Sequence, residues 1–246
     1  MQSLITVIGR GHSGTRAISH TLYASGVYMG SQLNPSGDKI PPHDMYDACR
    51  ILAKYVKWNG DLSWNFDQIL TMPLDPKFED LLNAYLSDVL NNTSDNRGWK
   101  IPETTLIYPW IIQMFPDIRY IHWIRDPRDC ILGSHKTDNL MDFGIEYALT
   151  DDIYKRRAIS WYYQYELMKA TPKPKHFIQV RFEDFILKQE ETLKRLEDFL
   201  GFSLGRIIVR PETVYRWKRT DEPCPLPFDF LREAIIENDY TLDISS

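Results

Sequence analysis

The sequence is poor in cysteine, and its cysteines are not spaced to form a metal site or a disulfide framework. Only three occur in 246 residues, at Cys49, Cys130 and Cys224, and they stand far apart. Structural zinc sites and disulfide-rich secreted domains need more cysteines at shorter or more regular spacings. We therefore expect no bound metal, a reducing environment and a cytoplasmic location.

Long hydrophobic runs and an excess of positive charge are also missing. No apolar run approaches the length of about 20 residues that spans a membrane, so we expect no stable membrane insertion. The apolar start is interrupted by Thr6, closed by Gly9 and not preceded by basic residues, unlike a signal peptide. The net charge is −5, whereas proteins that bind nucleic acid are usually basic. We expect no nucleic-acid partner, although a local basic pocket is compatible with this charge.

The sequence has the composition and pattern of one α/β domain over residues 1–246. Hydrophobic residues make up 43 % and charged residues 26 %, which is typical of globular proteins. Strands that alternate with helices predict a three-layer sandwich with a central, mostly parallel sheet. The predicted strands are 3–8, 98–101, 118–124 and 176–181, and the predicted helices are 15–25, 44–58, 76–90, 104–115, 152–170, 184–200 and 227–238, with a further helix after Asp126.

The first predicted strand leads into a glycine-rich loop, residues 9–16, and then into a helix. Such a loop directs backbone N–H groups and a helix N-terminus at one point, which suits a phosphate or a sulfate. Ser13 and Thr15 add hydroxyl groups, and His12 and Arg16 can add positive charge. The alternative is a glycine-rich turn without a function.

Two nucleotide-binding patterns match this loop incompletely. Gly9, Gly11 and Gly14 spell the dinucleotide fingerprint, but residues 26–32 lack the acidic residue expected about 20 positions on. Gly9 and Gly14 also have the spacing of a P-loop, but Thr15 stands where that motif has its lysine. A P-loop nucleotide kinase is therefore an alternative function.

A second candidate anion site follows the strand 118–124. Arg125 is the first residue after this strand and precedes Asp126, Pro127, Arg128 and Asp129. Because the carboxyl ends of parallel strands lie at one sheet edge, we expect Arg125 near the glycine-rich loop. A guanidinium group there can bind a second phosphate with two hydrogen bonds. The alternative is a salt bridge to Asp126 or Asp129.

These two segments, with later ones in the same order, resemble the sulfotransferase family over most of the chain. Residues 9–16 resemble its 5′-phosphosulfate loop, and residues 124–134 resemble its 3′-phosphate motif. Residues 99–102, 115–121 and 181–201 resemble its intervening segments, and residues 216–219 resemble its basic loop over the adenosine 3′-phosphate. The sequence departs from the pattern where His12 replaces a Lys or Arg, and where Gly133 occupies the usual serine position, one residue before Ser134.

The resemblance implies a P-loop NTPase-like fold and the sulfuryl donor 3′-phosphoadenosine 5′-phosphosulfate (PAPS), without a metal. The product would be adenosine 3′,5′-bisphosphate (PAP), and the acceptor a hydroxyl or amine of a small molecule, carbohydrate or lipid. A non-catalytic nucleotide-binding module is a further alternative. The residues implied to bind the donor are Arg10, Gly11, His12, Ser13, Gly14, Thr15, Arg16, Arg125, Ser134, Arg216, Trp217 and Lys218.

The resemblance also implies candidates for the chemical steps. His12, if protonated, and Lys100 would stabilise charge on the leaving group, and a histidine there would make activity sensitive to pH. Asp44 and His43 match the family's position for the general base, and Glu103 is a third candidate. A helix N-cap is the alternative role for Asp44.

The aromatic residues nearby are candidates for the acceptor pocket, with core packing as the alternative. They are Tyr46, Trp58, Trp64 and Phe66.

Overall fold

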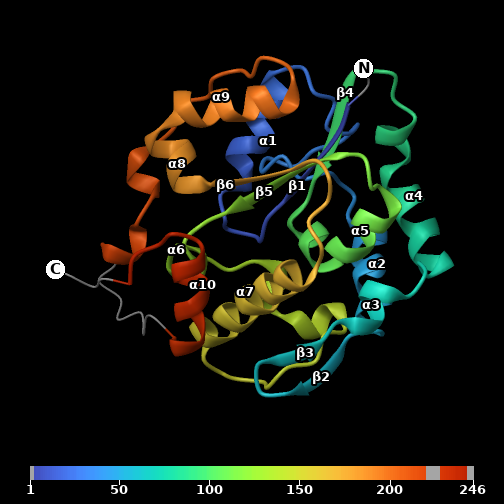
Figure 1. The fold of residues 1–246 in the computed structure, drawn as a ribbon, viewed down its shortest axis with the longest axis vertical. Helices are drawn as coiled ribbons and strands as arrows, with labels where there is room; N and C mark the ends of the chain where they lie inside the picture. The colour runs from blue at the N-terminus through green and yellow to red at the C-terminus, as the bar shows by residue number, and fades with distance from the viewer. Residues whose placement is uncertain (1–2, 220–227, 243–246) are drawn as a thin grey trace.

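The computed structural model describes residues 3–219 and 228–242, so Cys224 and the first residue of the predicted helix 227–238 lie outside the described residues. Four strands form a parallel sheet in the order β4-β1-β5-β6 (Figure 1). Their bounds are Ser3–Ile8 for β1, Asn96–Lys100 for β4, Arg119–Ile124 for β5 and Phe177–Arg181 for β6. The predicted parallel sheet is confirmed.

Helices cover both faces of the sheet. Alternate residues of a strand point to opposite faces, and β1 has apolar residues on both faces. Ile5 and Val7 of β1 pack with α1 (Thr15–Ala24), α8 (Phe182–Leu187) and α9 (Gln189–Leu200). Leu4 and Ile8 of the same strand belong to a second core. It includes residues of α2 (His43–Ala53), α4 (Pro76–Leu90), α5 (Tyr108–Met114) and α7 (Ile153–Ala170). Figure 1 shows these two groups of helices on opposite sides of the sheet, which is the predicted three-layer sandwich.

Several predicted boundaries agree with the structure because local signals determine them. The Asp75 carboxylate accepts a hydrogen bond from the Lys77 N–H at 2.8 Å, and Pro76 is the first residue of α4. The Asp152 carboxylate accepts from the N–H groups of Tyr154 and Lys155 at the start of α7. N-capping carboxylates and an initial proline are the expected signals of a helix N-terminus.

The region after α2 was predicted incorrectly as a continuous helix to residue 58. The helix ends at Ala53, and residues 57–65 form a hairpin of β2 (Lys57–Gly60) and β3 (Ser63–Asn65). Gly60 and Asp61 both have positive φ angles, of 102° and 47°, which allow the chain to reverse. The helix α3 (Asp67–Thr71) follows.

Three other predicted helices differ in extent. The segment predicted as one helix over 184–200 forms α8 and α9, which are separated at Lys188. A 3₁₀ helix, Pro102–Ile107, precedes α5 where one helix over 104–115 was predicted. Where one helix over 227–238 was predicted, a 3₁₀ helix, Asp229–Leu231, precedes α10 (Arg232–Glu237). The helix predicted after Asp126 is α6 (Pro127–Cys130).

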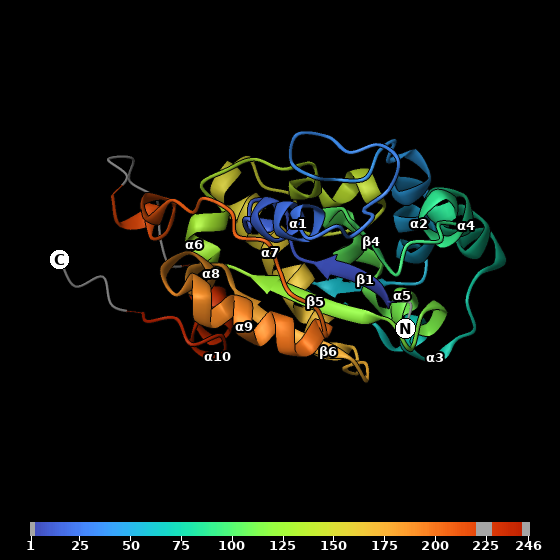
Figure 2. The same ribbon diagram turned by 90° about the horizontal axis from the view of Figure 1, so that it is seen from above.

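The C-terminal segment supports the loop that follows β5. Glu183 accepts hydrogen bonds from the Asp126 N–H at 3.0 Å and from the Tyr240 hydroxyl at 2.9 Å. Residues of α6, α7 and α10 share a small hydrophobic cluster. Figure 2 shows α6 and α10 at one end of the molecule and α3 and α4 at the other. Residues 228–242 therefore help to hold the loop after β5 in place.

The Gly98→Ala substitution should destabilise the sheet. A Cβ atom at residue 98 would lie 2.2 Å from the Ile5 carbonyl oxygen of the neighbouring strand, so the β4–β1 pairing would have to shift. We expect the free energy of unfolding to fall by about 1–3 kcal/mol, as for other overpacked sites. Urea denaturation measures this, with Thr93→Ala in the exposed loop before β4 as the control. Equal stability of the two variants would contradict the expected clash.

Candidate functional site

A cavity of about 440 Å³ lies at the carboxyl edge of the sheet. The residues that line it come from the ends of all four strands. Gly11, His12 and Gly14 follow β1, Lys100 ends β4, Arg125 follows β5 and Phe182 follows β6. This is the edge at which parallel α/β sheets bind ligands. Thr15 and Arg16 at the start of α1 also line the cavity.

The charges around the cavity are strongly unbalanced. Its described lining includes five lysine or arginine side chains and a single carboxylate, that of Asp38. The cations are Arg16, Lys100, Arg125, Arg210 and Arg216. In a chain of net charge −5, such a concentration of positive charge favours a ligand with several negative charges.

One wall of the same cavity is apolar. Phe182 and Ile186 of α8, with Ile207 and Val209 after α9, form this apolar wall. The cavity therefore offers both a charged surface and a hydrophobic surface, which together suit a ligand with anionic groups on an apolar ring system.

The backbone of the glycine-rich loop has positive φ angles, which favour glycine, at two residues. His12 and Gly14 have φ angles of 63° and 81°. A Cβ atom at residue 14 would lie 2.4 Å from the Phe182 ring. The Ser13 hydroxyl donates to the Arg10 carbonyl oxygen at 2.5 Å, and the Trp123 indole N–H donates to the Ser13 carbonyl oxygen at 3.1 Å. The Ser13 side chain therefore stabilises the loop from within.

Arg10 turns away from the cavity. Its guanidinium group is buried, forms an ion pair with Asp138 and donates to the Gly11 carbonyl oxygen at 2.9 Å. Neither Arg10 nor Ser13 is among the described residues that line the cavity. Of the residues that the sequence suggested in this loop, the structure brings Gly11, His12, Gly14, Thr15 and Arg16 to the cavity.

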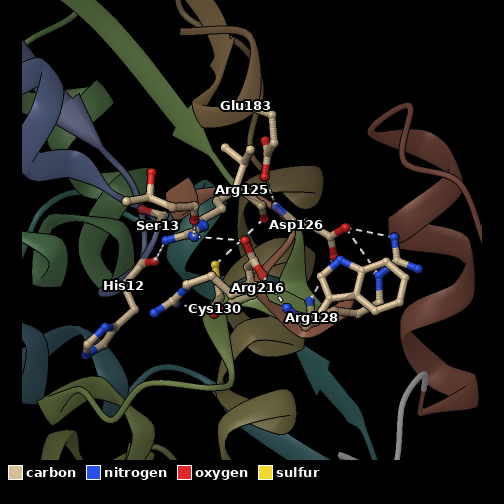
Figure 3. A network of polar contacts seen from close by, with 12 residues as sticks. His12, Ser13, Arg125, Asp126, Arg128, Cys130, Glu183 and Arg216 are labelled. Atoms are coloured by element: carbon tan, nitrogen blue, oxygen red, sulfur yellow. Dashed lines mark hydrogen bonds and ion pairs between the residues drawn. The ribbon is translucent and has the colours of Figure 1, made fainter. Parts of the chain in front are cut away.

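Arg125 connects the two predicted anion-binding segments. Its Nη1 atom donates to the His12 carbonyl oxygen at 3.2 Å (Figure 3). Its Nη2 atom lies 2.8 Å from the Asp129 carboxylate and also donates to the Thr213 carbonyl oxygen. The salt bridge to Asp129, given above as the alternative role of Arg125, is thus present, and Arg125 lines the cavity as well.

Only one of the three predicted residues in the basic loop after residue 215 reaches the cavity. Arg216 lines it and donates from Nη2 to the Asp129 carbonyl oxygen at 3.0 Å. The Trp217 ring lies over the Arg128 guanidinium group, 3.8 Å away, and Lys218 lies beside Trp217. Trp217 and Lys218 do not belong to the described lining.

Ser134 also lies outside the described lining, and it interacts with His12 through its backbone. The His12 Nε2–H donates to the Ser134 carbonyl oxygen. Burial lowers the pKa of His12, and the neighbouring Arg10 acts in the same direction. A Cβ atom at residue 133 would lie 2.4 Å from the His12 Nδ1 atom. The His12 imidazole thus fills the space that a side chain at residue 133 would need. The two departures from the family pattern, His12 and Gly133, therefore depend on each other.

Lys100 is a buried cation held by the loop after α1. Its Nζ atom pairs with Asp38 and donates to the Ser36 carbonyl oxygen at 2.8 Å. Burial lowers the pKa of Lys100, and the nearby Asp38 carboxylate opposes this effect. The ammonium group therefore has one carboxylate partner at the side of an otherwise basic cavity.

The three candidates for the general base have different surroundings. His43 and Asp44 lie in the first turn of α2, where His43 is exposed, and neither is among the described lining residues. Glu103 is 2 % exposed and follows Pro102, which lines the cavity, but Glu103 itself is not among the described lining residues. The pKa of Glu103 is raised to about 7, mainly by burial and also by Asp38, while a backbone hydrogen bond and Lys100 act in the opposite direction.

Two of the aromatic residues suggested for an acceptor pocket are buried in the core. Trp64 and Phe66 both pack edge-on against Tyr163 of α7. Tyr46 packs against Phe143, and Trp58 is partly buried against the same core. None of the four is among the described lining residues.

Several cavity residues were not found from the sequence. They are His20, Asp38, His135, Ile207, Val209, Arg210 and Thr213. Arg210 precedes a proline in a charged segment, and that is the ordinary pattern of an exposed loop. His135 is the one with a sequence signal, since it directly follows Ser134 in the second anion-binding motif.

Comparisons with known proteins agree with the geometry. The fold and the basic cavity define an α/β protein of the P-loop-like class. The model of the sulfotransferase family matches residues 5–205, and the chain belongs to this family. Among curated proteins no match is found.

Two solved structures share the fold over nearly the whole length of both chains. The sulfotransferase domain from the curacin biosynthetic pathway has a TM-score of 0.62 at 13 % identity and covers 99 % of each chain. The sulfotransferase domain of the Synechococcus PCC 7002 olefin synthase has a TM-score of 0.55 at 15 % identity. It covers 99 % of this chain and 98 % of its own.

The described residues contain no group of three or more His, Cys, Asp or Glu side chains placed to hold a metal ion. In the same residues, every helix is too short or too polar to cross a lipid bilayer.

The contact between His12 and residue 133 can be tested with a double-mutant cycle. Gly133→Ala alone should lower the free energy of unfolding by about 1–3 kcal/mol, because the new methyl group overlaps the imidazole. In the His12→Ala background the same substitution should cost less than about 0.5 kcal/mol. Chemical denaturation of the four proteins gives the coupling, and additive effects would show that the imidazole does not occupy this space.

Proposed function

We propose that the protein transfers a sulfuryl group from PAPS to a hydroxyl or amine of a small-molecule, carbohydrate or lipid acceptor. The observation that carries this proposal is the cavity at the sheet edge, with five cationic side chains and one carboxylate in its described lining. PAPS has a phosphate at one end, a phosphosulfate at the other and an adenosine between them. Membership of the sulfotransferase family supports sulfuryl transfer as the reaction.

The arrangement of the lining residues fits such a donor. Arg125 and Arg216 lie together, with Asp129 between them, and are assigned to the 3′-phosphate. Residues 11–16 and the N-terminus of α1 are assigned to the 5′-phosphosulfate, which suits an oxyanion at backbone N–H groups. The apolar wall is assigned to the adenosine.

The other residues predicted to bind the donor have supporting roles in this proposal. Arg10 and Ser13 shape the glycine-rich loop through their own hydrogen bonds. Ser134 anchors the His12 ring, and Trp217 covers Arg128. We propose that they position the residues that touch the donor.

Catalysis in such a site is mostly positioning and charge stabilisation. In the transfer, the bond between sulfur and the bridging oxygen of the phosphosulfate breaks, a bond from sulfur to the acceptor forms, and the acceptor proton passes to a base. Because the His12 Nε2–H group already donates to the Ser134 carbonyl oxygen, we assign the stabilisation of the leaving oxygen to Lys100 and Arg16. His12 then orders the loop.

Glu103 is the candidate base whose pKa best suits the task. Its value of about 7 lies near the pH of the cell, where a general base is most effective. Asp44 and His43 keep the family position of the base and are the alternatives. The cytoplasmic location and the single domain stay predictions of the sequence.

Arg125→Ala should weaken the binding of PAP severely. The substitution removes a guanidinium group that lines the cavity, and the loss of such a charge-assisted contact corresponds to at least about a 30-fold rise in Kd. Isothermal titration calorimetry without metal measures the affinity. Arg216→Ala is a second test, because the Arg216 guanidinium group lines the cavity and donates to a backbone oxygen, that of Asp129.

The matched control is Arg195→Ala, which removes an exposed arginine of α9. Its PAP affinity should equal that of the wild type. Unchanged PAP binding by both cavity variants would overturn the assignment. Tight binding of Mg-ATP by the wild type without PAP binding would favour the kinase alternative instead.

Replacing the candidate bases should separate their roles. Glu103→Gln should lower kcat about 100-fold and leave the Kd for PAP unchanged. In the wild type, kcat should rise with pH and level off above about pH 7, because the base must be deprotonated. This rise should vanish in the variant. Full activity of Glu103→Gln together with a low kcat of Asp44→Asn would move the role to Asp44.

A further inference from the structure

His135 is one of three histidines among the described cavity residues, with His12 and His20, and nothing above gives it a role. It lies in the loop between α6 and α7 and lines the cavity together with His12, Lys100 and Asp38. The charges that act on it are those of Arg10, His12, Asp38 and Lys100. It therefore lies at the Lys100 side of the cavity, which the proposed function assigns to the phosphosulfate.

The backbone around His135 is held in place by buried neighbours. Its N–H group donates to the Asp138 carboxylate at 2.6 Å, and Asp138 is in turn the ion-pair partner of Arg10. The Ser160 hydroxyl of α7 donates to the Thr137 carbonyl oxygen at 2.6 Å. The loop thus has little freedom to move the imidazole.

Hydrogen bonds also fix the tautomer of the ring. The Thr137 N–H donates to the His135 Nδ1 atom at 3.2 Å, and the Thr137 hydroxyl lies 3.0 Å from the same nitrogen. A nitrogen that accepts a hydrogen bond from a backbone N–H has no proton, so in the neutral imidazole the proton is on Nε2. Since Nδ1 is engaged by Thr137, Nε2–H is the polar group that the ring has available for the cavity.

The imidazole stays neutral at this position. Burial lowers the pKa of His135 to about 3, and the positive charge of Arg10 acts in the same direction. A neutral ring in a basic site donates a hydrogen bond without bringing a further positive charge. It also keeps its proton throughout, because loss of the Nε2 proton would leave an imidazolate.

The ring lies directly against the glycine-rich loop. A Cβ atom at Gly11 would lie 2.0 Å from the His135 Cγ atom, so only a glycine permits this approach. The rings of His12 and His135 meet edge to face at 6.2 Å between centroids. The His135 ring is therefore fixed beside the backbone that is assigned to the phosphosulfate.

From this geometry we infer that His135 is a donor-specific contact: its Nε2–H donates a hydrogen bond to the sulfuryl group of the donor. This inference rests on the proposed function, since it needs a phosphosulfate in the first loop. His135 neither gives up nor takes up a proton in the transfer. It distinguishes the donor PAPS from the product PAP, which lacks the sulfuryl group.

The test compares the affinities of His135→Ala for PAPS and for PAP, both measured without an acceptor. The Kd for PAPS should rise about tenfold, as expected for one hydrogen bond to a charged group, while the Kd for PAP stays within twofold of the wild type. His135→Gln, which keeps an N–H donor, should recover part of the PAPS affinity. His176→Ala, outside the described cavity lining, is the control.

A second readout does not depend on any ligand. The ¹⁵N chemical shifts of the His135 imidazole should show a neutral ring with the proton on Nε2 between pH 5 and pH 8. A proton on Nδ1, or an equal loss of PAPS and PAP affinity in His135→Ala, would overturn the inference. If the wild type binds neither PAPS nor PAP, the proposed function itself fails, and the inference fails with it.

Discussion

The hydrogen bond from Arg125 Nη1 to the His12 carbonyl oxygen joins two loops that are 113 residues apart in the chain. It exists because β1 and β5 are adjacent and parallel, so their carboxyl ends meet. The strand order β4-β1-β5-β6 extends this constraint to the whole cavity. Lys100 ends β4, Arg125 follows β5 and Phe182 follows β6, and the Arg125 guanidinium group lies 4.4 Å from the centre of the Phe182 ring. The strand order therefore places a cation directly beside the apolar wall.

Three buried cations at or behind the cavity have carboxylate partners. Arg10 pairs with Asp138, Lys100 with Asp38 and Arg125 with Asp129. Burying a cation without a partner is costly, so these pairs offset the cost of burying the three cations. Asp38 is the one partner that itself lines the cavity. An incoming anion must therefore compete with Asp38 for Lys100, which favours a multiply charged ligand over a single one.

The parts of the site that the sequence predicts are those fixed by local chemistry. The glycine spacing of residues 9–14 and an arginine directly after a strand are visible in the sequence, and the structure brings Gly11, Arg16 and Arg125 to one cavity. The partner that a side chain contacts depends on tertiary packing and was harder to predict. Arg10 and Trp217 have the residue types of ligand contacts, but buried Asp138 and Arg128 engage them instead.

Two glycines show how the loops on either side of the cavity fit together. The His135 ring fills the space beside Gly11, and the His12 ring fills the space beside Gly133. Each loop thus inserts a histidine into the gap left by a glycine of the other, and burial lowers the pKa of both imidazoles. The positive charge at the glycine-rich loop then comes from Arg16 and Lys100, and the two rings act through N–H groups whose directions are fixed. A loop of this kind selects its ligand by geometry as well as by charge.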